Sequence, residues 1–198
     1  MDRALASVSA GCMIRPLYLT GQFLLALPGI GDPRFDHAVI AMCAHDSQGA
    51  MGIGIGAQIA DLGLHEILEQ FEIDVGDAPD APVNFGGPVE PGRGFVLHSN
   101  DWGGQDTIDV AGRWSLSGTI DILRAIAEGR GPSRWVVALG YAGWSEGQLD
   151  REMTQHGWLS LEGDPALIFE TPARDRWTRA LAGAGVDPRF LSSEGGRA

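Results

Sequence analysis

The stretch Arg134–Trp158 constrains the fold more than any other part of this chain. Residues 135–139 (Trp-Val-Val-Ala-Leu) form an apolar run, rich in valine, with the length of a buried strand. The glycines of residues 140–143 predict a tight turn, because glycine adopts backbone conformations that other residues avoid. Ser145 and Gln148 then match the capping box that opens a helix. The stretch therefore predicts a strand, a glycine turn and a helix beginning at Ser145.

Apolar patterns elsewhere in the chain predict further strands and helices. The predicted strands cover residues 17–27, 37–44, 50–55, 83–89, 94–99, 107–111, 114–116 and 158–161. The predicted helices are one capped by Asp61 and reaching Phe71, one at 119–128, a helical turn at 164–165 and one at 173–182. Strands follow one another as hairpins instead of alternating strictly with helices. This order predicts an α+β fold, with helices packed on an antiparallel or mixed sheet.

Composition limits the class of protein and its partners. With 198 residues, 44% apolar and 20% charged, the chain has the length and balance of one soluble globular domain. We expect this domain to cover residues 16–191, between a disordered leader at 1–15 and a polar tail at 192–198. Acidic residues outnumber basic ones by 26 to 14, and the net charge of −12 opposes general attraction to DNA or anionic lipid.

Cysteine content and hydropathy indicate the compartment. Cys12 and Cys43 provide no disulfide framework and suit a reducing cytosol. Residues 1–10 lack the apolar core of a signal peptide, and no run approaches the ~20 apolar residues of a membrane span. We therefore expect a cytoplasmic protein without a membrane partner.

Residues 143–147 (Gly-Trp-Ser-Glu-Gly) match the nucleophile elbow of α/β-hydrolases. Such a serine needs a histidine base, and His156 is the only histidine after Ser145. In a helix that begins at Ser145, His156 would lie on the order of 16 Å away. A serine hydrolase is therefore the weakest functional interpretation, and we expect no catalytic residues.

Cys43 and His45 are residue types that bind metals, and they lie two positions apart at the end of a predicted strand. Residues at this spacing face the same side of a regular strand and would offer two ligands. A closed site needs four, and nothing in the sequence brings His98 near the pair. We expect a buried thiol and a hydrogen-bonded histidine, with no metal or cofactor.

The most basic segment of the chain contains Arg174, Arg176, Arg179 and Arg189. Arginine binds phosphates, and the neighbouring Trp177 is a residue type that stacks on bases. No known DNA-binding motif is recognisable, however, and the apolar face of the predicted helix needs Trp177 for packing. We interpret the segment as a solvated helix face, with direct DNA binding as the alternative.

Four sets of short motifs occur in order along the chain. They are Cys43–Asp46 with Gly49–Gly52, Phe85–Val89 with Gly94–Ser99, Gly140–Trp144 with Gly147–Leu149, and Phe169 followed by Arg176–Trp177 and Ala180–Leu181. Together they resemble the YqgE/AlgH family of bacterial proteins. The resemblance implies an α+β fold in which a bent sheet closes into a flattened pseudo-barrel. Members carry the label of transcriptional regulator, without an established DNA-binding motif or a known reaction.

One segment departs from the pattern of that family. After Gly-Ala-Met-Gly, members usually continue with a hydrophobic pair and Asn-Arg-Pro or Asn-Lys-Pro, whereas this chain has Ile-Gly-Ile-Gly-Ala-Gln at 53–58. Any binding that relatives owe to that basic loop is therefore not expected here.

These observations favour a binding or interaction protein with an indirect regulatory role and an unknown protein or small-molecule partner. Tryptophan and tyrosine suit contact surfaces, and histidine and glutamine add polar contacts. The predicted contact residues are His45, His98, Tyr141, Trp144 and Gln148. A DNA-binding regulator is the first alternative, disfavoured by the net charge, and a hydrolase using Ser145 is the second.

Overall fold

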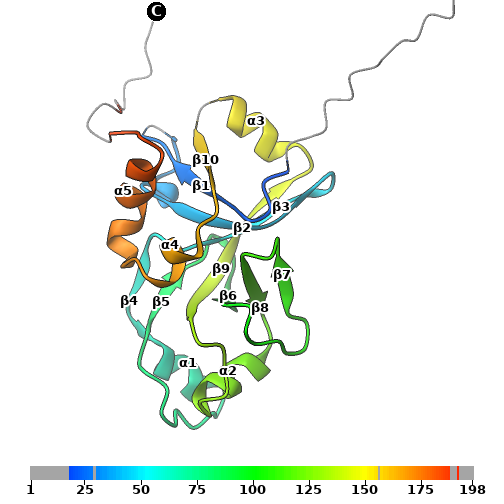
Figure 1. Ribbon diagram of the computed structural model, residues 1–198, viewed down its shortest axis with the longest axis vertical. Helices are drawn as coiled ribbons and strands as arrows, with labels where there is room; N and C mark the ends of the chain where they lie inside the picture. Colours follow the sequence, from blue (N-terminus) through cyan, green and yellow to red (C-terminus); the bar gives the residue numbers. More distant parts are fainter. Residues whose placement is uncertain (1–17, 29, 156, 188–190, 192–198) are drawn as a thin grey trace, which may run out of the picture.

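The computed structural model describes residues 18–28, 30–155, 157–187 and 191. The chain adopts an α+β fold in which a strongly curled, mainly antiparallel sheet forms a half-barrel with helices packed outside it (Figure 1). This confirms the predicted fold class. The expected leader at 1–15 and tail at 192–198 lie outside the described residues.

Ten strands form the sheet. They are β1 (Gln22–Ala26), β2 (Val39–Asp46), β3 (Gly49–Gly54), β4 (Gln58–Gly63), β5 (Pro82–Phe85), β6 (Val89–His98), β7 (Ile108–Val110), β8 (Trp114–Ser117), β9 (Trp135–Ser145) and β10 (Trp158–Glu162). The main path runs β10-β1-β2-β3-β9-β6-β8-β7, and β5 joins from the side, parallel to β9 and antiparallel to β4. The sheet is therefore mixed, and β7 ends it on one side.

Strand β9 connects the two halves of the sheet. Its first part pairs with β5 and β6, and residues 142–145 pair with β3. Close to this change of partners, Gly140 has a φ of +71° and bends the strand, while Tyr141 after it still pairs with Val89 of β6. The predicted turn at 140–143 is therefore wrong, because these glycines bend a continuous strand. Figure 1 shows β9 running from the lower half of the molecule into the upper half.

Backbones meet closely at this bend. A Cβ atom at Gly140 would overlap the carbonyl oxygen of Gly87, and one at Gly86 would overlap the carbonyl oxygen of Gly140. Only glycine allows the β5–β6 connection to pass this near to β9. The close crossing of the chains therefore explains Gly86, Gly87 and Gly140 of these motifs.

Five α-helices and one short 3₁₀ helix are present among the described residues. They are α1 (Leu64–Gln70), α2 (Ile120–Ala127), α3 (Gln148–Thr154), α4 (Pro165–Phe169), α5 (Ala173–Gly183) and η1 (Pro33–Phe35). Helices α1 and α2 lie together at one end of the molecule, and α4 and α5 lie beside the other half of the sheet (Figure 1).

Two helix starts differ from the prediction. Helix α3 begins at Gln148 with Gly147 as its N-cap, although Gln148 Oε1 accepts the backbone N–H of Ser145 at 3.1 Å as in the predicted capping box. Helix α1 begins after Gly63, whose N–H is accepted by Glu66 at 3.0 Å. Asp61 instead lies in β4, a strand missed because its mostly exposed residues carry little apolar alternation.

Helix α5 carries a buried arginine. Its buried residues are Ala173, Arg176, Trp177, Ala180 and Leu181, which follow the spacing of one helix face. The Arg176 guanidinium donates to the carbonyl oxygens of Leu167, Ile168 and Thr171 at 2.6–3.1 Å, and also to that of Ile55. Burial lowers the pKa of Arg176 to about 10, so the side chain stays charged at neutral pH.

Candidate functional site

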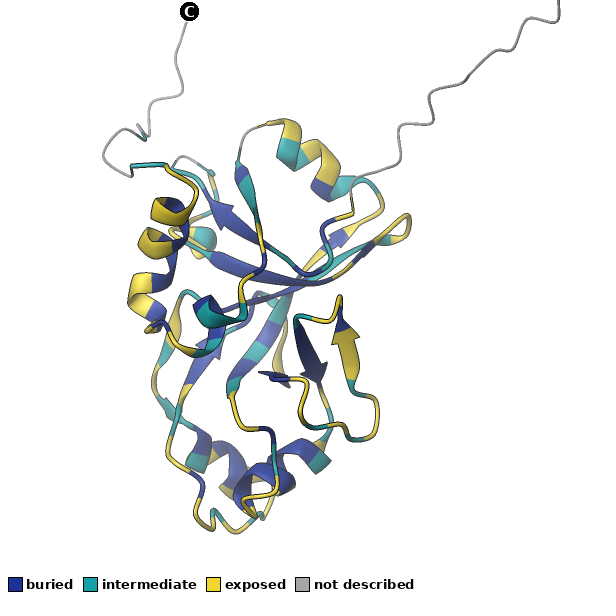
Figure 2. Ribbon diagram, in the orientation of Figure 1, coloured by how far each residue is buried: buried dark blue, intermediate teal, exposed yellow. Residues whose placement is uncertain are grey.

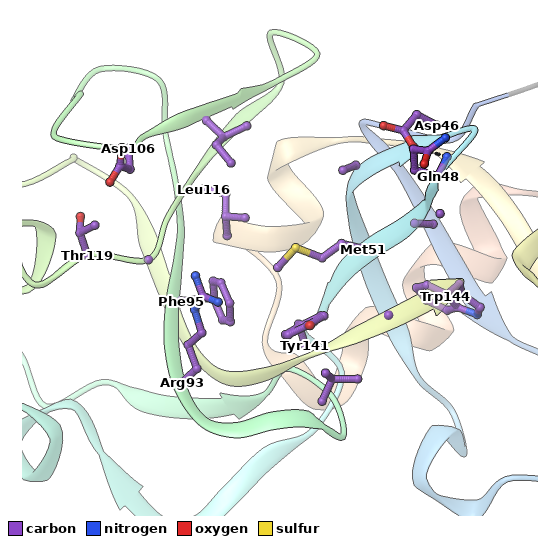
Figure 3. Close-up of a pocket in the computed structure, with 17 residues that line it drawn as sticks. Asp46, Gln48, Met51, Arg93, Phe95, Asp106, Leu116, Thr119, Tyr141 and Trp144 are labelled. Atoms are coloured by element: carbon purple, nitrogen blue, oxygen red, sulfur yellow. Dashed lines mark hydrogen bonds between the residues drawn. The ribbon is translucent and has the colours of Figure 1, made fainter. Parts of the chain in front are cut away.

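An open cleft of about 830 Å³ lies between the β2–β3 hairpin and the β7–β8 hairpin. Its floor is apolar and is formed by Met51, Phe95, Leu116 and Tyr141 (Figure 3). Phe95 and Leu116 belong to the largest core cluster, and Met51 and Tyr141 pack against it. Phe95 and Leu116 are buried, so the apolar surface that the floor exposes comes from the half-buried Met51 and Tyr141.

The aromatic part of the floor is held in a defined arrangement. The rings of Phe95 and Tyr141 meet edge to face, with centroids 5.9 Å apart. The guanidinium of Arg93 lies 5.0 Å from the centroid of the Phe95 ring, a distance suited to a cation–π contact. Arg93 also pairs with Glu90, with Nη1 and Oε2 at 3.2 Å. The floor thus offers apolar contact beside one neutralised cation.

The rim of the cleft is polar. Asp46 and Gln48 lie on one side, and Asp106 and Thr119 lie on the other (Figure 3). Asp46 accepts the backbone N–H of Gln48 at 2.7 Å, which fixes the hairpin tip, and both aspartates are exposed. An occupant of the cleft would meet a carboxylate on each side.

Tyr141 and Trp144 are the predicted contact residues that the fold brings to this cleft. Trp144 is mostly buried, and its indole N–H donates to Glu152 Oε2 at 2.9 Å, as does that of Trp158. Gln148 donates to Glu152 Oε1 at 2.9 Å and lines a smaller, neighbouring pocket. Glu152 therefore connects α3 to the sheet through hydrogen bonds, and the predicted contact residues Trp144 and Gln148 are two of its donors.

His45 is buried at the edge of β2 and does not reach the cleft. Its Nδ1 accepts the backbone N–H of Leu19 at 3.1 Å, and its ring meets Tyr18 edge to face. Cys43 instead packs in the main core, because a β-bulge between Met42 and Ala44 turns the strand. The predicted common orientation of Cys43 and His45 is therefore wrong.

The buried Cys43 thiol leads to a chemical prediction. Desolvation raises its pKa to about 12, so the unreactive thiol form dominates at neutral pH. In a Cys12→Ser variant, we expect an aromatic disulfide reagent to leave the native protein unmodified at about pH 8 and to react completely once urea unfolds it. Rapid reaction of the native variant would contradict this burial.

His98 is fully buried, and the fold does not place it on any contact surface. Its Nδ1 lies 2.9 Å from the carbonyl oxygen of Ser99, which only accepts, so Nδ1 carries the proton. Nε2 then accepts from the Ser117 hydroxyl at 3.1 Å, and that hydroxyl contacts Thr107 at 2.8 Å. His98 therefore organises the β6–β8 pair in its neutral form.

Burial lowers the pKa of His98 below its ordinary value. Because the folded pKa is depressed, this group's contribution to stability is present above the unfolded pKa and is lost as pH falls through the folded pKa. We expect the free energy of unfolding to fall as pH drops below about 6.5, and a His98→Gln variant to show a flatter profile there. The check is urea unfolding of the wild type and of the variant over that range, and equal slopes for the two proteins would contradict the role of His98.

Ser145 lacks the partners of a catalytic serine within the described residues. Its hydroxyl donates to Gln148 Oε1 at 3.1 Å, and an amide oxygen cannot serve as a general base. His156, the histidine considered as its base, lies outside the described residues. Ser145 is exposed at the end of β9, so it has no buried pocket around it.

The basic segment does not form one arginine surface. Arg176 is buried in the core, whereas Arg174 and Arg179 are exposed on α5, and Arg174 lies 3.7 Å from Asp175. Arg189 lies outside the described residues. The sequence did contain a signal for the buried residue, because Arg176 falls within the apolar stripe of its helix.

Other residues of the cleft were missed by sequence reasoning. Arg93, Phe95 and Asp106 lie far in the sequence from the β2–β3 hairpin that they face. Residues of these types are common in strands and loops, so they gave no signal in the sequence. In the described part of the chain, no group of histidine, cysteine and acidic residues could hold a metal ion, and no helix has the length and hydropathy needed to span a membrane.

Comparison with known proteins identifies relatives over nearly the whole chain. A protein-family model described as AlgH-like matches residues 23–189 of this chain. A UPF0301 protein of Sphingopyxis alaskensis is 60% identical over 92% of this chain and 98% of its own, and one of Rhizorhabdus wittichii is 56% identical over 94% and 100%. The solution structure of the AlgH protein from Pseudomonas aeruginosa superposes with a TM-score of 0.74 at 39% identity, covering 93% of this chain and 98% of that one. This chain therefore belongs to the AlgH-like family.

Proposed function

We propose that this protein is a cytoplasmic binding protein, which contacts a protein or small-molecule partner through the cleft and has an indirect regulatory role. The observation that carries the proposal is an open cleft between two hairpins, with the half-buried Met51 and Tyr141 on its floor above the buried Phe95. Sites for ligands are concave and mostly apolar, with a few polar groups at defined positions.

The types of residue in the cleft support binding. Aromatic residues, methionine and arginine are enriched where proteins contact partners, and Phe95, Tyr141, Met51 and Arg93 meet in this cleft. Ile108 lies at its border with 54% of its surface exposed, which is unusual for an isoleucine in a strand. Covering Met51, Tyr141 and Ile108 would remove apolar surface from water, whereas Phe95 is already buried beneath them.

The polar groups beside the cleft support binding over catalysis. Asp46 already accepts the N–H of Gln48 in its own turn, and Arg93 is paired with Glu90. The described lining residues include no histidine, serine or cysteine, and none of the polar lining residues Asp46, Asp106, Thr119 and Tyr141 is paired with a histidine or lysine base there.

A fragment screen tests the proposal. Uniformly ¹⁵N-labelled protein is titrated with a library of uncharged aromatic and aliphatic fragments, and amide chemical shifts are followed by NMR. We expect the shifts caused by the strongest binders to cluster at Ala44, Met51, Ile108 and Tyr141, which surround the cleft.

A second apolar groove provides an internal comparison. It has a volume of about 280 Å³ and lies beside α1 and α2, with Phe71 and Ile120 exposed at its borders. Fragments that collect in this groove, or that shift no cleft residue, would overturn the proposal.

A further inference from the structure

We infer that the occupant of the cleft is an extended, cationic peptide segment of a partner protein. Its apolar side chains would cover Met51, Ile108 and Tyr141, and its basic side chains would meet Asp46 and Asp106. The inference rests on the proposed function, because it names the partner of the same cleft.

Charge complementarity selects a cationic partner. Asp46 and Asp106 face the cleft from opposite sides, and Arg93 is the only basic residue among its described lining residues. Arg93 is itself paired with Glu90, so the cleft keeps an excess of negative charge. The whole chain adds a net charge of −12, which attracts cations from a distance.

The surroundings of the cleft favour a peptide over a compact ligand. Strand β7 is the last strand on its side of the sheet, so one of its edges has no strand partner among the described residues. Figure 2 shows β7 largely exposed beside the buried β8. Ile108 of β7 lines the cleft. An added extended segment gains main-chain hydrogen bonds at such an edge and places alternate side chains toward one face.

Selection from a random peptide library tests the inference. The displayed peptides are about nine residues long, which spans about 30 Å when extended. We expect enriched peptides to carry arginine or lysine near both ends and apolar residues at alternate central positions. An Ala44→Arg variant, which places a positively charged side chain at an exposed position of the cleft, should enrich none of them.

Matched charge variants test the rim. The double variant Asp46→Asn, Asp106→Asn keeps the turn acceptor of Asp46 and suits the positive φ of 58° at Asp106. We expect it to bind the enriched peptides about tenfold more weakly at low salt. The control double variant Asp61→Asn, Asp74→Asn removes the same amount of charge away from the cleft. Asp61 also has a positive φ, and Asp74 also accepts a backbone N–H in a turn. We expect this control to change the affinity for the enriched peptides by less than about twofold.

The outcomes separate this inference from the proposed function. Enrichment of acidic peptides, enrichment of the same cationic peptides that survives Ala44→Arg, or equal weakening by both double variants would overturn it. If no peptide is enriched while uncharged fragments still bind in the cleft, the peptide inference falls and the binding function stands. If neither peptides nor fragments bind there, both fall.

Discussion

Replacing Arg176 with alanine should lower the free energy of unfolding by about 3–5 kcal/mol. The guanidinium supplies hydrogen bonds to four buried carbonyl oxygens, on Ile55, Leu167, Ile168 and Thr171. Removing it leaves those oxygens without their donor and opens a cavity between α4, α5 and the sheet. Urea unfolding followed by circular dichroism measures the loss.

The matched control for this change is Arg174→Ala on the same helix. The Arg174 side chain is 86% exposed, and its contact with Asp175 is long. We expect this variant to stay within about 0.5 kcal/mol of the wild type. Equal stability of the two alanine variants would show that Arg176 does not hold the helices to the sheet.

Replacing Gly140 with alanine should cost about 2–5 kcal/mol, the second large effect. The residue has a φ of +71°, and an added methyl group would overlap the carbonyl oxygen of Gly87 where β9 crosses the β5–β6 connection. The positive φ is unfavourable for alanine, and the overlap forces the two chains apart. Both effects destabilise the bend that joins the two halves of the sheet. Thermal and urea unfolding measure the change.

Gly112 separates these two causes. It has a φ of +70°, and no atom lies within 4 Å of the Cβ that alanine would add. Gly112→Ala should therefore show only the conformational cost of about 1–2 kcal/mol. If Gly140→Ala is no more harmful than Gly112→Ala, the close crossing of the chains is not what requires glycine at this bend.

Much of the fold was predictable because its strands and helices have local patterns. The run at 135–139, the hairpin of β2 and β3 and the apolar stripe of α5 each carry the periodicity of the element they form. The Gly140 bend was misread as a turn, because a positive φ in glycine serves both a turn and a bent strand. Only tertiary pairing distinguishes the two.

The candidate site was less predictable, because tertiary structure alone brings its residues together. Tyr141 and Trp144 stood out as aromatics beside glycines, and the structure places both at the cleft. His98 was misjudged because a histidine on a strand looks the same whether its partners are buried hydroxyls or solvent. Phe95 and Asp106 become neighbours of the site only when β6, β7 and β8 curl toward the β2–β3 hairpin.

The most direct test of the central claim compares two charged substitutions on exposed strand positions. Ala44 lines the cleft, and Ala60 lies on β4 away from it; both are exposed alanines. The same library of uncharged fragments is screened by NMR against Ala44→Glu, Ala60→Glu and the wild type. We predict that Ala60→Glu keeps the cleft binders and that Ala44→Glu loses them. Binding that survives Ala44→Glu unchanged would contradict the assignment of the cleft as the binding site.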